Sequence, residues 1–344
     1  MNSLLTHIER MTRERERPLL EVALTEALLD RLGVSSVSVV KALVTPEEVF
    51  VWPAVISDST GTQLHDDGLS LPEEMISIEY HPLLEACYKS GVAQESGDDT
   101  VVPIIKADGT WFGFVEVAGR VLDATETSLV TGLTAIFTNM LALLDYSEVD
   151  TLTGLLNRKT FDEYLMKILS SLAVGDDSRL EARHLPLRRK HRSTAQDHWL
   201  GVLDIDFFKR INDNFGHLIG DEVLLLVATM MKGSFRVYDK LFRFGGEEFV
   251  VLLKPTEDSN AQVAFERFRA EMEAREFPQV GRVTISIGFA RIGPKDQPSR
   301  IIDNADEALY WAKEHGRNQV VNYEALLAAG LLEKKEQTSD VELF

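Results

Sequence analysis

The second half of the chain alternates between the two periodicities of regular secondary structure. An apolar run of strand length that ends in two carboxylates lies at 199–206, a further strand is expected at 283–292, and a hairpin with Gly-Gly at its tip lies at 241–253. Helical spacing of apolar residues fills the intervals, near 221–232, 259–275 and 301–315. This β-α-β-β-α-β order leaves few ways to pair the strands and cover the sheet. We therefore expect a ferredoxin-like or palm-type sheet here, in a two-domain chain of the α+β class.

The first half reads as a separate α+β domain. Apolar residues between 4 and 32 share one face of a helix or helix pair, a strand pair follows, and Gly91 ends a short helix. Two β-rich runs are then joined at an Asp-Gly turn. The run WFGFVEV after that turn resembles GAF sensor domains. The resemblance implies a GAF-like α/β sensor over 19–125, preceded by an N-terminal helix over 1–18.

Composition narrows the class of protein. The chain has 44% apolar and 26% charged residues, an ordinary globular balance, and we expect no apolar run that approaches the ~20 residues that span a bilayer. The N-terminus lacks a secretory apolar core, and the single Cys87 excludes an intrachain disulfide and a cysteine-based zinc site. The net charge of -19 repels nucleic acids and anionic membranes. We expect a cytoplasmic protein that binds neither, although a small phosphorylated ligand remains possible.

A heptad-like stripe lies between the two halves. It consists of Leu129, Leu133, Ile136, Met140 and Leu143, at spacings of 4, 3, 4 and 3. One interpretation is a helix packed on its own domain. The other is a dimeric coiled coil over 126–149 that links the sensor to the second domain. The stripe covers two heptads and does not decide between them.

Carboxylates gather at two predicted strand ends. Asp204 and Asp206 close the run at 199–206, and Glu247 and Glu248 follow the two glycines of the hairpin. Carboxylates massed at one sheet edge repel each other unless a cation binds, and hard divalent ions such as Mg²⁺ prefer oxygen ligands. The alternative is a surface hairpin with solvated glutamates.

Five sequence blocks, taken together, resemble the GGDEF diguanylate cyclase family. They are DTLTGLLNRKTF at 150–161, DIDFFKRINDNFGHLIGDEVL, RFGGEEF, TISIG and ALYWAKEHGRNQV, with Glu in the third position of the signature. The resemblance spans about 150–323. It implies a cyclase domain over 150–326, with a loose tail over 327–344, that condenses two GTP into cyclic di-GMP and releases two pyrophosphates.

The resemblance also implies a metal site. Asp204 and Glu247 would be metal ligands together with the Ile205 carbonyl. Glu248 would assist the second metal or deprotonate the attacking 3′-hydroxyl. Two Mg²⁺ or Mn²⁺ ions per active site are implied, and such a pair supplies the charge neutralisation that phosphoryl transfer needs.

Nucleotide contacts are implied by the same blocks. Phosphate contacts fall on Lys209, Lys313, Arg317 and the backbone amides of Phe207 and Phe208. Asn212 and Asp221 match the guanine-reading positions, and a carboxylate suits the guanine N1–H and exocyclic amine. Lys313 and Arg317 are four residues apart, so we expect one helical face that converges on a triphosphate. His217 is expected to complete a turn.

A second site and a second copy are implied as well. Arg236 and Asp239 stand where the family carries an RxxD inhibitory site for its product, and Arg267 lies on a helix that often supplies a supporting arginine. A surface ion pair is the alternative for Arg236 and Asp239. Because one domain binds one GTP and the product joins two, we expect a homodimer.

Other interpretations remain open. One is a cyclic di-GMP receptor without turnover, which the loss of a signature acid would favour. Another is a cyclase that accepts ATP, in which the adenine N1 acceptor would clash with the Asp221 carboxylate. The third is a structural scaffold, which would not need acids at both strand ends. In the first domain we expect core roles for His81, Cys87, Trp52, Trp111 and Phe112. The segment 179–192, with six basic residues and one acidic residue, is expected to be a solvated insertion.

Overall fold

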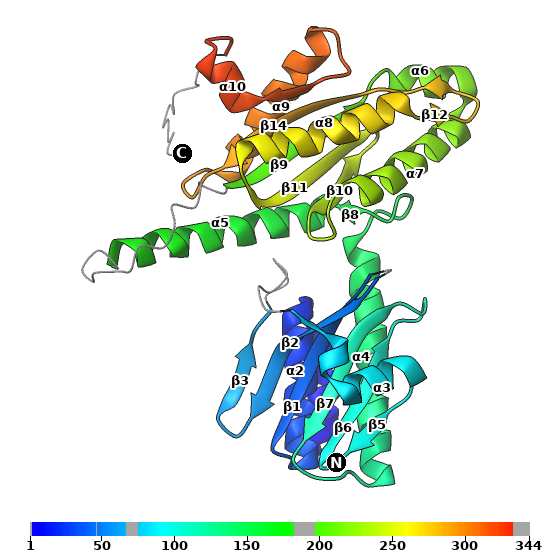
Figure 1. Ribbon diagram of the computed structural model, residues 1–344, viewed down its shortest axis with the longest axis vertical. Coiled ribbons are helices and arrows are strands. Elements are labelled where there is room, and N and C mark those ends of the chain that lie inside the picture. The colour runs from blue at the N-terminus through cyan, green and yellow to red at the C-terminus, as the bar shows by residue number, and fades with distance from the viewer. Residues whose placement is uncertain (1, 46, 67–74, 182–196, 333–344) are drawn as a thin grey trace. The chain divides into compact units, whose positions relative to one another are not determined.

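The computed structural model divides the chain into two compact units, Met1–Ser147 and Glu148–Phe344 (Figure 1). The residues it describes are 2–45, 47–66, 75–181 and 197–332. Most of the basic segment and of the expected tail lies outside these residues. Each unit is described by itself.

The first unit is built on an antiparallel sheet with the order β3-β2-β1-β7-β6-β5, in which β4 pairs with β2. The strands are β1 (Ser36–Val44), β2 (Val49–Asp58), β3 (Gly61–Leu64), β4 (Ile76–Ser77), β5 (Gln94–Ser96), β6 (Asp99–Ile105) and β7 (Trp111–Ala118). The expected hairpin between β6 and β7 is confirmed. Its turn contains Gly109 at φ +83°, a conformation that glycine adopts without strain.

Helices cover both faces of this sheet. They are α1 (Asn2–Arg13), α2 (Arg17–Leu32), the 3₁₀ turn η1 (Ile78–Tyr80), α3 (Pro82–Ser90) and α4 (Ala124–Glu148). The main core packs α1, α2 and α4 against one face. A smaller core, which includes Leu84, Cys87 and Phe114, lies under α3 on the other face. The helix pair and the stop at Gly91 agree with the sequence.

The heptad-like stripe belongs to the core of the first unit. Leu133 and Met140 are buried in that core, and Leu129 and Ile136 pack against it. Leu143 alone of the five is largely exposed, at 63%. The interpretation as a helix packed on its own domain is therefore confirmed. A separate coiled-coil linker over 126–149 was a wrong expectation, because α4 supplies a wall of the first unit.

The same helix is long and apolar enough, by length and composition, to cross a membrane. It has 25 residues and an 18-residue window with a mean hydropathy of 1.6, of which 33% is buried inside the unit. It is the one such helix within the described ranges. The expectation that no apolar run approaches this length was wrong, because no charged residue occurs between 127 and 144.

The second unit carries the expected palm-type sheet, with the order β15-β14-β9-β11-β10-β8. The central strands β9, β10, β11 and β14 are antiparallel, whereas β8 and β15 are parallel additions at the edges. Their bounds are β8 (Leu156–Asn157), β9 (Asp197–Ile205), β10 (Lys240–Gly245), β11 (Glu248–Thr256), β14 (Ile285–Ile292) and β15 (Val320–Asn322). The ferredoxin-like prediction is confirmed by this order.

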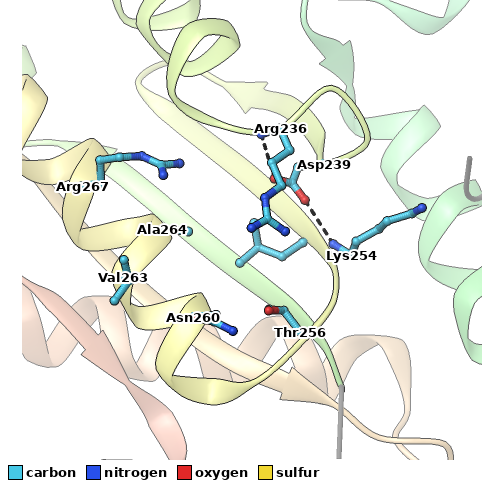
Figure 2. A pocket seen from close by; sticks show the side chains of 9 residues that line it. Arg236, Asp239, Lys254, Thr256, Asn260, Val263, Ala264 and Arg267 are labelled. Atoms are coloured by element: carbon cyan, nitrogen blue, oxygen red, sulfur yellow. Dashed lines mark hydrogen bonds between the residues drawn. The ribbon is translucent and has the colours of Figure 1, made fainter. Parts of the chain in front are cut away.

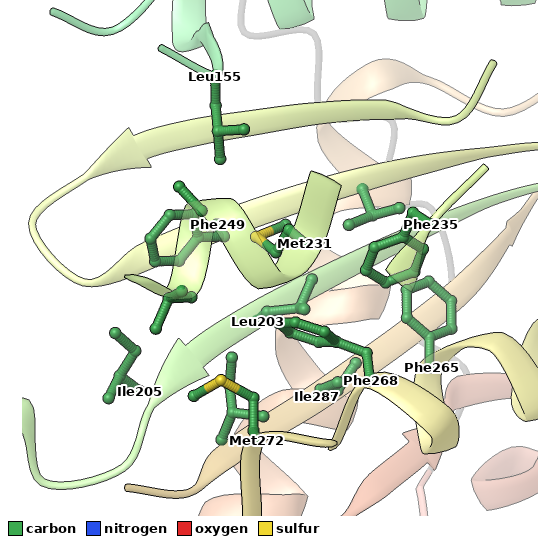
Figure 3. Packing of buried hydrophobic residues seen from close by; sticks show 14 of the residues in the cluster. Leu155, Leu203, Ile205, Met231, Phe235, Phe249, Phe265, Phe268, Met272 and Ile287 are labelled. Carbon is green, nitrogen blue, oxygen red and sulfur yellow. The ribbon is translucent and has the colours of Figure 1, made fainter. Parts of the chain in front are cut away.

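Helices pack on both faces of the second sheet and create two cores. The helices are α5 (Arg158–Glu181), α6 (Phe208–Phe215), α7 (His217–Ser234), α8 (Asp258–Ala274), α9 (Pro298–Glu314) and α10 (Tyr323–Ala328), and a small hairpin joins β12 (Glu276–Phe277) to β13 (Gly281–Arg282). Figure 3 shows the core on the side of α7 and α8, where Phe235, Phe265 and Phe268 pack together.

Burial on both faces explains the continuous apolar run of β9. Leu203 and Ile205 belong to the core beside α7 and α8, whereas Leu200 and Val202 belong to the core beside α9. Because successive side chains of a strand point to opposite faces, Asp204 falls on the α9 face. The Asp204 carboxylate therefore lies on the same face of β9 as the core residues Leu200 and Val202, at the end of the strand.

Candidate active site

Two of the predicted acids face each other across neighbouring strands. Asp204, at the end of β9, is the direct register partner of Glu248, at the start of β11. The hairpin before Glu248 bends through Gly245 (φ +150°) and Gly246 (φ +54°), conformations that L side chains rarely adopt. The glycines thus allow the turn that places Glu247 and Glu248 beside the end of β9.

A clasp from the start of the unit holds this turn. The Arg243 guanidinium donates to the Gly246 carbonyl from Nε (3.2 Å) and from a terminal nitrogen (2.9 Å). Its other terminal nitrogen lies 3.0 Å from Oδ1 of Asp150. The same carboxylate accepts from the backbone and hydroxyl of Thr153, and these contacts hold the pKa of Asp150 below its usual value despite partial burial. The block at 150–161 therefore supports the hairpin.

Helix α9 brings a cation to the acids. It packs so closely on β14 that a Cβ added at Gly288 would lie 2.1 Å from the backbone nitrogen of Leu309. From this helix the Lys313 Nζ reaches 2.9 Å from Oδ2 of Asp204. Burial raises the pKa of Asp204, and the charges of Glu247 and Glu248 add to that effect, while Lys313 opposes it. The acids at this edge therefore share one electrostatic field.

Sequence reasoning missed one member of that field. Asp306 lies two turns before Lys313 on α9, and its pKa is raised to about 6 by desolvation first and then by the charges of Glu248 and Asp303. The spacing of seven residues between Asp306 and Lys313 was the available signal, because it places both on one helical face.

The donor chemistry of this edge fits a hard divalent cation. In the described part of the chain, no three His, Cys, Asp or Glu side chains form a ready-made metal cluster. Yet the charges of Glu247 and Glu248 raise the cost of ionising Asp204, and the side-chain donors of these three residues are all oxygens. Carboxylate and carbonyl oxygens are what Mg²⁺ prefers. The residues therefore suit the implied ion.

The two predicted base-reading residues come from adjacent helices that lie together. Asn212 is on α6 and Asp221 is on α7. A Cβ added at Gly220, next to Asp221, would lie 2.0 Å from Oδ1 of Asn212. The Asn212 side chain therefore packs on the backbone beside Asp221. His217 begins α7 directly after Gly216 (φ +83°), in agreement with its expected place at a turn.

The predicted phosphate contacts lie near the C-terminal end of β9, but not as expected. Lys209 is exposed on α6, which begins after Phe207 at φ +58°. Arg317 does not share a helical face with Lys313, because α9 ends at Glu314 and Arg317 follows at φ +62°. That expectation was wrong. The Arg317 guanidinium instead lies 4.6 Å from the centre of the Phe207 ring, and Arg210 lies 4.5 Å from it.

A second pocket contains the other predicted arginines (Figure 2). It encloses about 90 Å³, and Arg236, Asp239 and Lys254 line it together with Arg267 from α8. Asp239 accepts from the backbone nitrogens of Arg236 (3.0 Å) and Lys254 (3.2 Å). Among the described residues, no ion pair joins the side chains of Arg236 and Asp239. Burial raises the pKa of Asp239, and the nearby charges of Arg236 and Arg267 oppose that shift.

The aromatic and sulfur groups of the first unit take structural places. Cys87 is fully buried, and desolvation raises the pKa of its thiol to about 12. Trp52 is buried and donates to Asp66, while Trp111 packs on Tyr88 and Phe112 on Phe137. His81 is exposed directly before the first turn of α3, so the expectation of a core role was wrong for this residue. None of them forms a cluster that suggests a cofactor.

Comparison with known proteins assigns the second unit. Residues 179–319 match the family model for the diguanylate cyclase GGDEF domain. Diguanylate cyclase DgcP of Pseudomonas aeruginosa is 40% identical over 174 residues, which are 50% of this chain and 23% of that protein. Response regulator PleD of Caulobacter vibrioides is 37% identical over 184 residues, 52% of this chain and 36% of that protein.

Solved structures match the same region. The GGDEF domain of DgcB from Caulobacter crescentus, in complex with c-di-GMP, has 31% identity and a TM-score of 0.44, and the match covers 52% of this chain and 96% of that one. The chain spans less than two thirds of the curated relatives above, and the first unit lies outside the matched family model. The second unit of this chain contains a GGDEF domain of the diguanylate cyclase family.

Proposed function

We propose that the second unit condenses two GTP into cyclic di-GMP and two pyrophosphates. The observation that carries the proposal is the juxtaposition of Asp204, Glu248 and Lys313: two acids paired across β9 and β11, with an ammonium 2.9 Å from the first. Phosphoryl transfer requires positioning and charge neutralisation more than covalent chemistry, and this edge offers both signs of charge.

Asp204, Glu247 and the Ile205 carbonyl are the proposed ligands of two Mg²⁺ or Mn²⁺ ions. When bound, such ions would neutralise charge on the phosphates and stabilise the developing charge on the attacking oxygen. Glu248, as part of the same acidic field, is the proposed acceptor of the proton from the 3′-hydroxyl. A carboxylate within hydrogen-bond reach of the hydroxyl can accept this proton as the new bond forms.

The cations hold the triphosphate in this proposal. Lys313 and Arg317 approach from the end of α9, Lys209 from α6, and the backbone amides of Phe207 and Phe208 point from the first turn of α6. Helix N-termini favour anions through their unpaired N–H groups. These groups orient the phosphate chain for attack in line with the leaving pyrophosphate.

Asn212 and Asp221 are the proposed readers of guanine. The amide of Asn212 can donate and accept, and the carboxylate of Asp221 can accept from N1–H and the exocyclic amine. Adenine presents an acceptor at N1, which would face the carboxylate unfavourably. The proposal therefore favours GTP over ATP, and the presence of all signature acids favours a cyclase over a receptor without turnover.

The reaction requires a second copy, because each domain holds one nucleotide and the product contains two. We propose a homodimer in which two active sites face each other. The GAF-like first unit is proposed to sense a signal in the cytoplasm, where GTP is available. The first unit is joined to the second by the chain that leads from α4 to Asp150, the residue that pairs with Arg243.

Product analysis tests the catalytic proposal directly. The full chain is incubated with GTP, with ATP and with both, in Mg²⁺ or in excess EDTA, and products are separated and identified by mass. Cyclic di-GMP from GTP in Mg²⁺ alone is expected. Asp221→Ser should shift the GTP preference in competition by about 10-fold, since a hydrogen bond in a desolvated site is worth ~1–3 kcal/mol. Absence of cyclic product from the wild type would reject the proposal.

The second pocket is the proposed site of product feedback. Arg236 and Arg267 supply donors for guanine or phosphate. Asp239 accepts from the backbone nitrogen of Arg236 and so fixes the turn that carries this arginine. Arg236→Ala should keep its initial rate, while the inhibition constant for cyclic di-GMP rises roughly 10- to 100-fold, the worth of one charged contact. Calorimetric titration with cyclic di-GMP checks this. Equal affinity in both proteins would place any feedback elsewhere.

A further inference from the structure

We infer that Asp206 is a positioning residue that holds Arg317 in place for the triphosphate, and that it does not serve as a metal ligand. The inference rests on the proposed function, because Arg317 has a phosphate to contact only if this unit binds GTP. Asp206 stands two residues after Asp204 in the sequence, and the pattern alone groups both with the metal-binding acids.

The carboxylate of Asp206 is already occupied by protein donors. Asp206 is 5% exposed. Its Oδ1 accepts from the Ser286 hydroxyl (2.7 Å), and its Oδ2 accepts from the Thr284 hydroxyl (2.7 Å) and from the backbone nitrogen of Asn318 (3.0 Å). Asp204, by contrast, pairs with the Lys313 ammonium and feels the charges of Glu247 and Glu248. A buried carboxylate with three donors is satisfied without a cation.

The donor at Asn318 belongs to an unusual turn. Arg317 and Asn318 have φ values of +62° and +46°, two successive non-glycine residues in the left-handed region. The backbone nitrogen of Arg317 donates to the Ala312 carbonyl. The Gln319 side-chain amide donates to the same carbonyl and to the backbone carbonyl of His315. These bonds tie the turn to α9. The bond to Asp206 ties it to the end of β9.

The same residue also sets the surface against which Arg317 rests. Phe207 follows Asp206 directly and stands at φ +58°, and the Arg317 guanidinium lies 4.6 Å from the centre of its ring. The Asp206 backbone nitrogen is fixed by the Thr284 carbonyl at 2.9 Å. Asp206 therefore holds both partners of the Arg317–Phe207 contact. It holds Phe207 because the two residues are adjacent in the chain, and it holds Arg317 through the hydrogen bond from the next residue, Asn318. Displacement of Asp206 would move Arg317 relative to Lys313.

A double-mutant cycle tests this coupling. GTP is titrated calorimetrically into full-length protein in excess EDTA, which prevents turnover and removes any metal contribution. Asp206→Asn keeps the size of the side chain but replaces one acceptor oxygen with a donor. We expect the Kd to rise about 10-fold, as for a displaced binding group, and Arg317→Ala to give a similar rise. The double variant should bind within about twofold of Arg317→Ala alone.

Controls separate positioning from loss of fold. Asp296→Asn is the matched control, because Asp296 also accepts a backbone N–H, from Gly293 at 2.8 Å, in a turn outside the proposed site. Its Kd should equal that of the wild type. Circular dichroism and thermal melting check each variant. If Asp206→Asn does not fold, Ser286→Ala removes one donor to the carboxylate and should give a smaller rise, again absent when Arg317 is alanine.

Each result has a clear meaning. An unchanged Kd for folded Asp206→Asn, or a double variant whose Kd rises by the product of the single effects, overturns the inference. A loss of affinity in Asp206→Asn that appears only when Mg²⁺ is present would make Asp206 a metal contact and also overturn it. If the wild type binds GTP but forms no cyclic product, the proposed reaction fails while the coupling between Asp206 and Arg317 remains measurable.

Discussion

Both units place acidic side chains around a single lysine, and the two clusters differ in access to solvent. In the first unit, Lys41 on β1 lies 2.9 Å from Glu21 of α2 and 3.1 Å from Asp66, and Glu21 is fully buried. In the second unit, Lys313 lies 2.9 Å from Asp204, with Glu247 and Glu248 near an open sheet edge. The first cluster is closed inside the fold, whereas the second leaves acids available to bind something else.

The difference separates a structural use of charge from a functional one. A buried charge is costly unless its partner stays in place, so the closed cluster stabilises the fold only as a complete set. In the second cluster Asp204 is buried, but Glu248 is exposed and Lys313 is partly exposed, so solvent screens these charges more and they add less to stability. The same pairing of lysine with carboxylate therefore predicts opposite phenotypes in the two units.

The largest effect is expected at the open edge and in activity alone. Asp204→Asn and Glu247→Gln should each lower turnover by at least about a thousandfold, since the loss of metal stabilisation is worth several kcal/mol. The melting temperature should stay the same or rise, because one of several mutually repelling acids is removed. Steady-state assays and calorimetry on the full chain measure both. Retention of more than a few per cent of activity in both variants would reject the metal assignment.

The matched pair Lys41→Met and Lys313→Met compares the clusters directly. Lys41→Met leaves two buried carboxylates without their ammonium and should cost about 3 kcal/mol of unfolding free energy. Lys313→Met should cost less unfolding free energy than Lys41→Met while it lowers turnover, because Lys313 is partly exposed and only one buried carboxylate, Asp204, loses its ammonium. Peptide-resolved hydrogen exchange locates each effect. Equal destabilisation by both substitutions would contradict the comparison.

The pH dependence of the closed cluster sharpens the comparison further. Burial raises the pKa of Glu21 to about 7, and Lys41 only partly opposes it. The folded state therefore keeps a proton that the unfolded chain releases near pH 4.5, so stability is fully present at acid pH and falls as pH rises towards 7. The loss approaches about 3 kcal/mol.

Glu21→Gln should flatten this slope between about pH 4.5 and 7 without altering the melting of the second unit. The conservative control is Glu95→Gln, on the exposed strand β5, which should retain the slope of the wild type. Urea unfolding at several pH values, followed through hydrogen exchange of peptides from α2 and β1, provides the measurement. An unchanged slope in Glu21→Gln would mean that the proton is held elsewhere.

Much of this structure was predictable because its signals are local. The apolar run of β9 reflects burial on both faces of the sheet, and the hairpin at 241–253 carries its own glycines. The five blocks placed the acids correctly at strand ends. Gly316, directly after the predicted helix, was a stop signal that could have corrected the expectation that Lys313 and Arg317 share a helical face.

The rest depended on contacts that no local pattern records. A heptad-like stripe and the buried face of a core helix have the same spacing, so only packing decided the place of Leu133 and Met140. Asp204 and Asp206 also have the same relation to their strand. What distinguishes them is a set of donors from residues 284, 286 and 318, far along the chain.

The clasp between Arg243 and Asp150 has a consequence for anyone who would cut this protein into fragments. The matched family segment begins at residue 179, yet the turn before Glu247 and Glu248 is held by Asp150, and β8 at Leu156–Asn157 extends the sheet beside β10. At the other end, Glu324 accepts from the backbone of Arg291, five residues past the segment. A fragment trimmed to the matched segment 179–319 would keep Asp204, Glu247 and Glu248 and lose the residues that hold them in position.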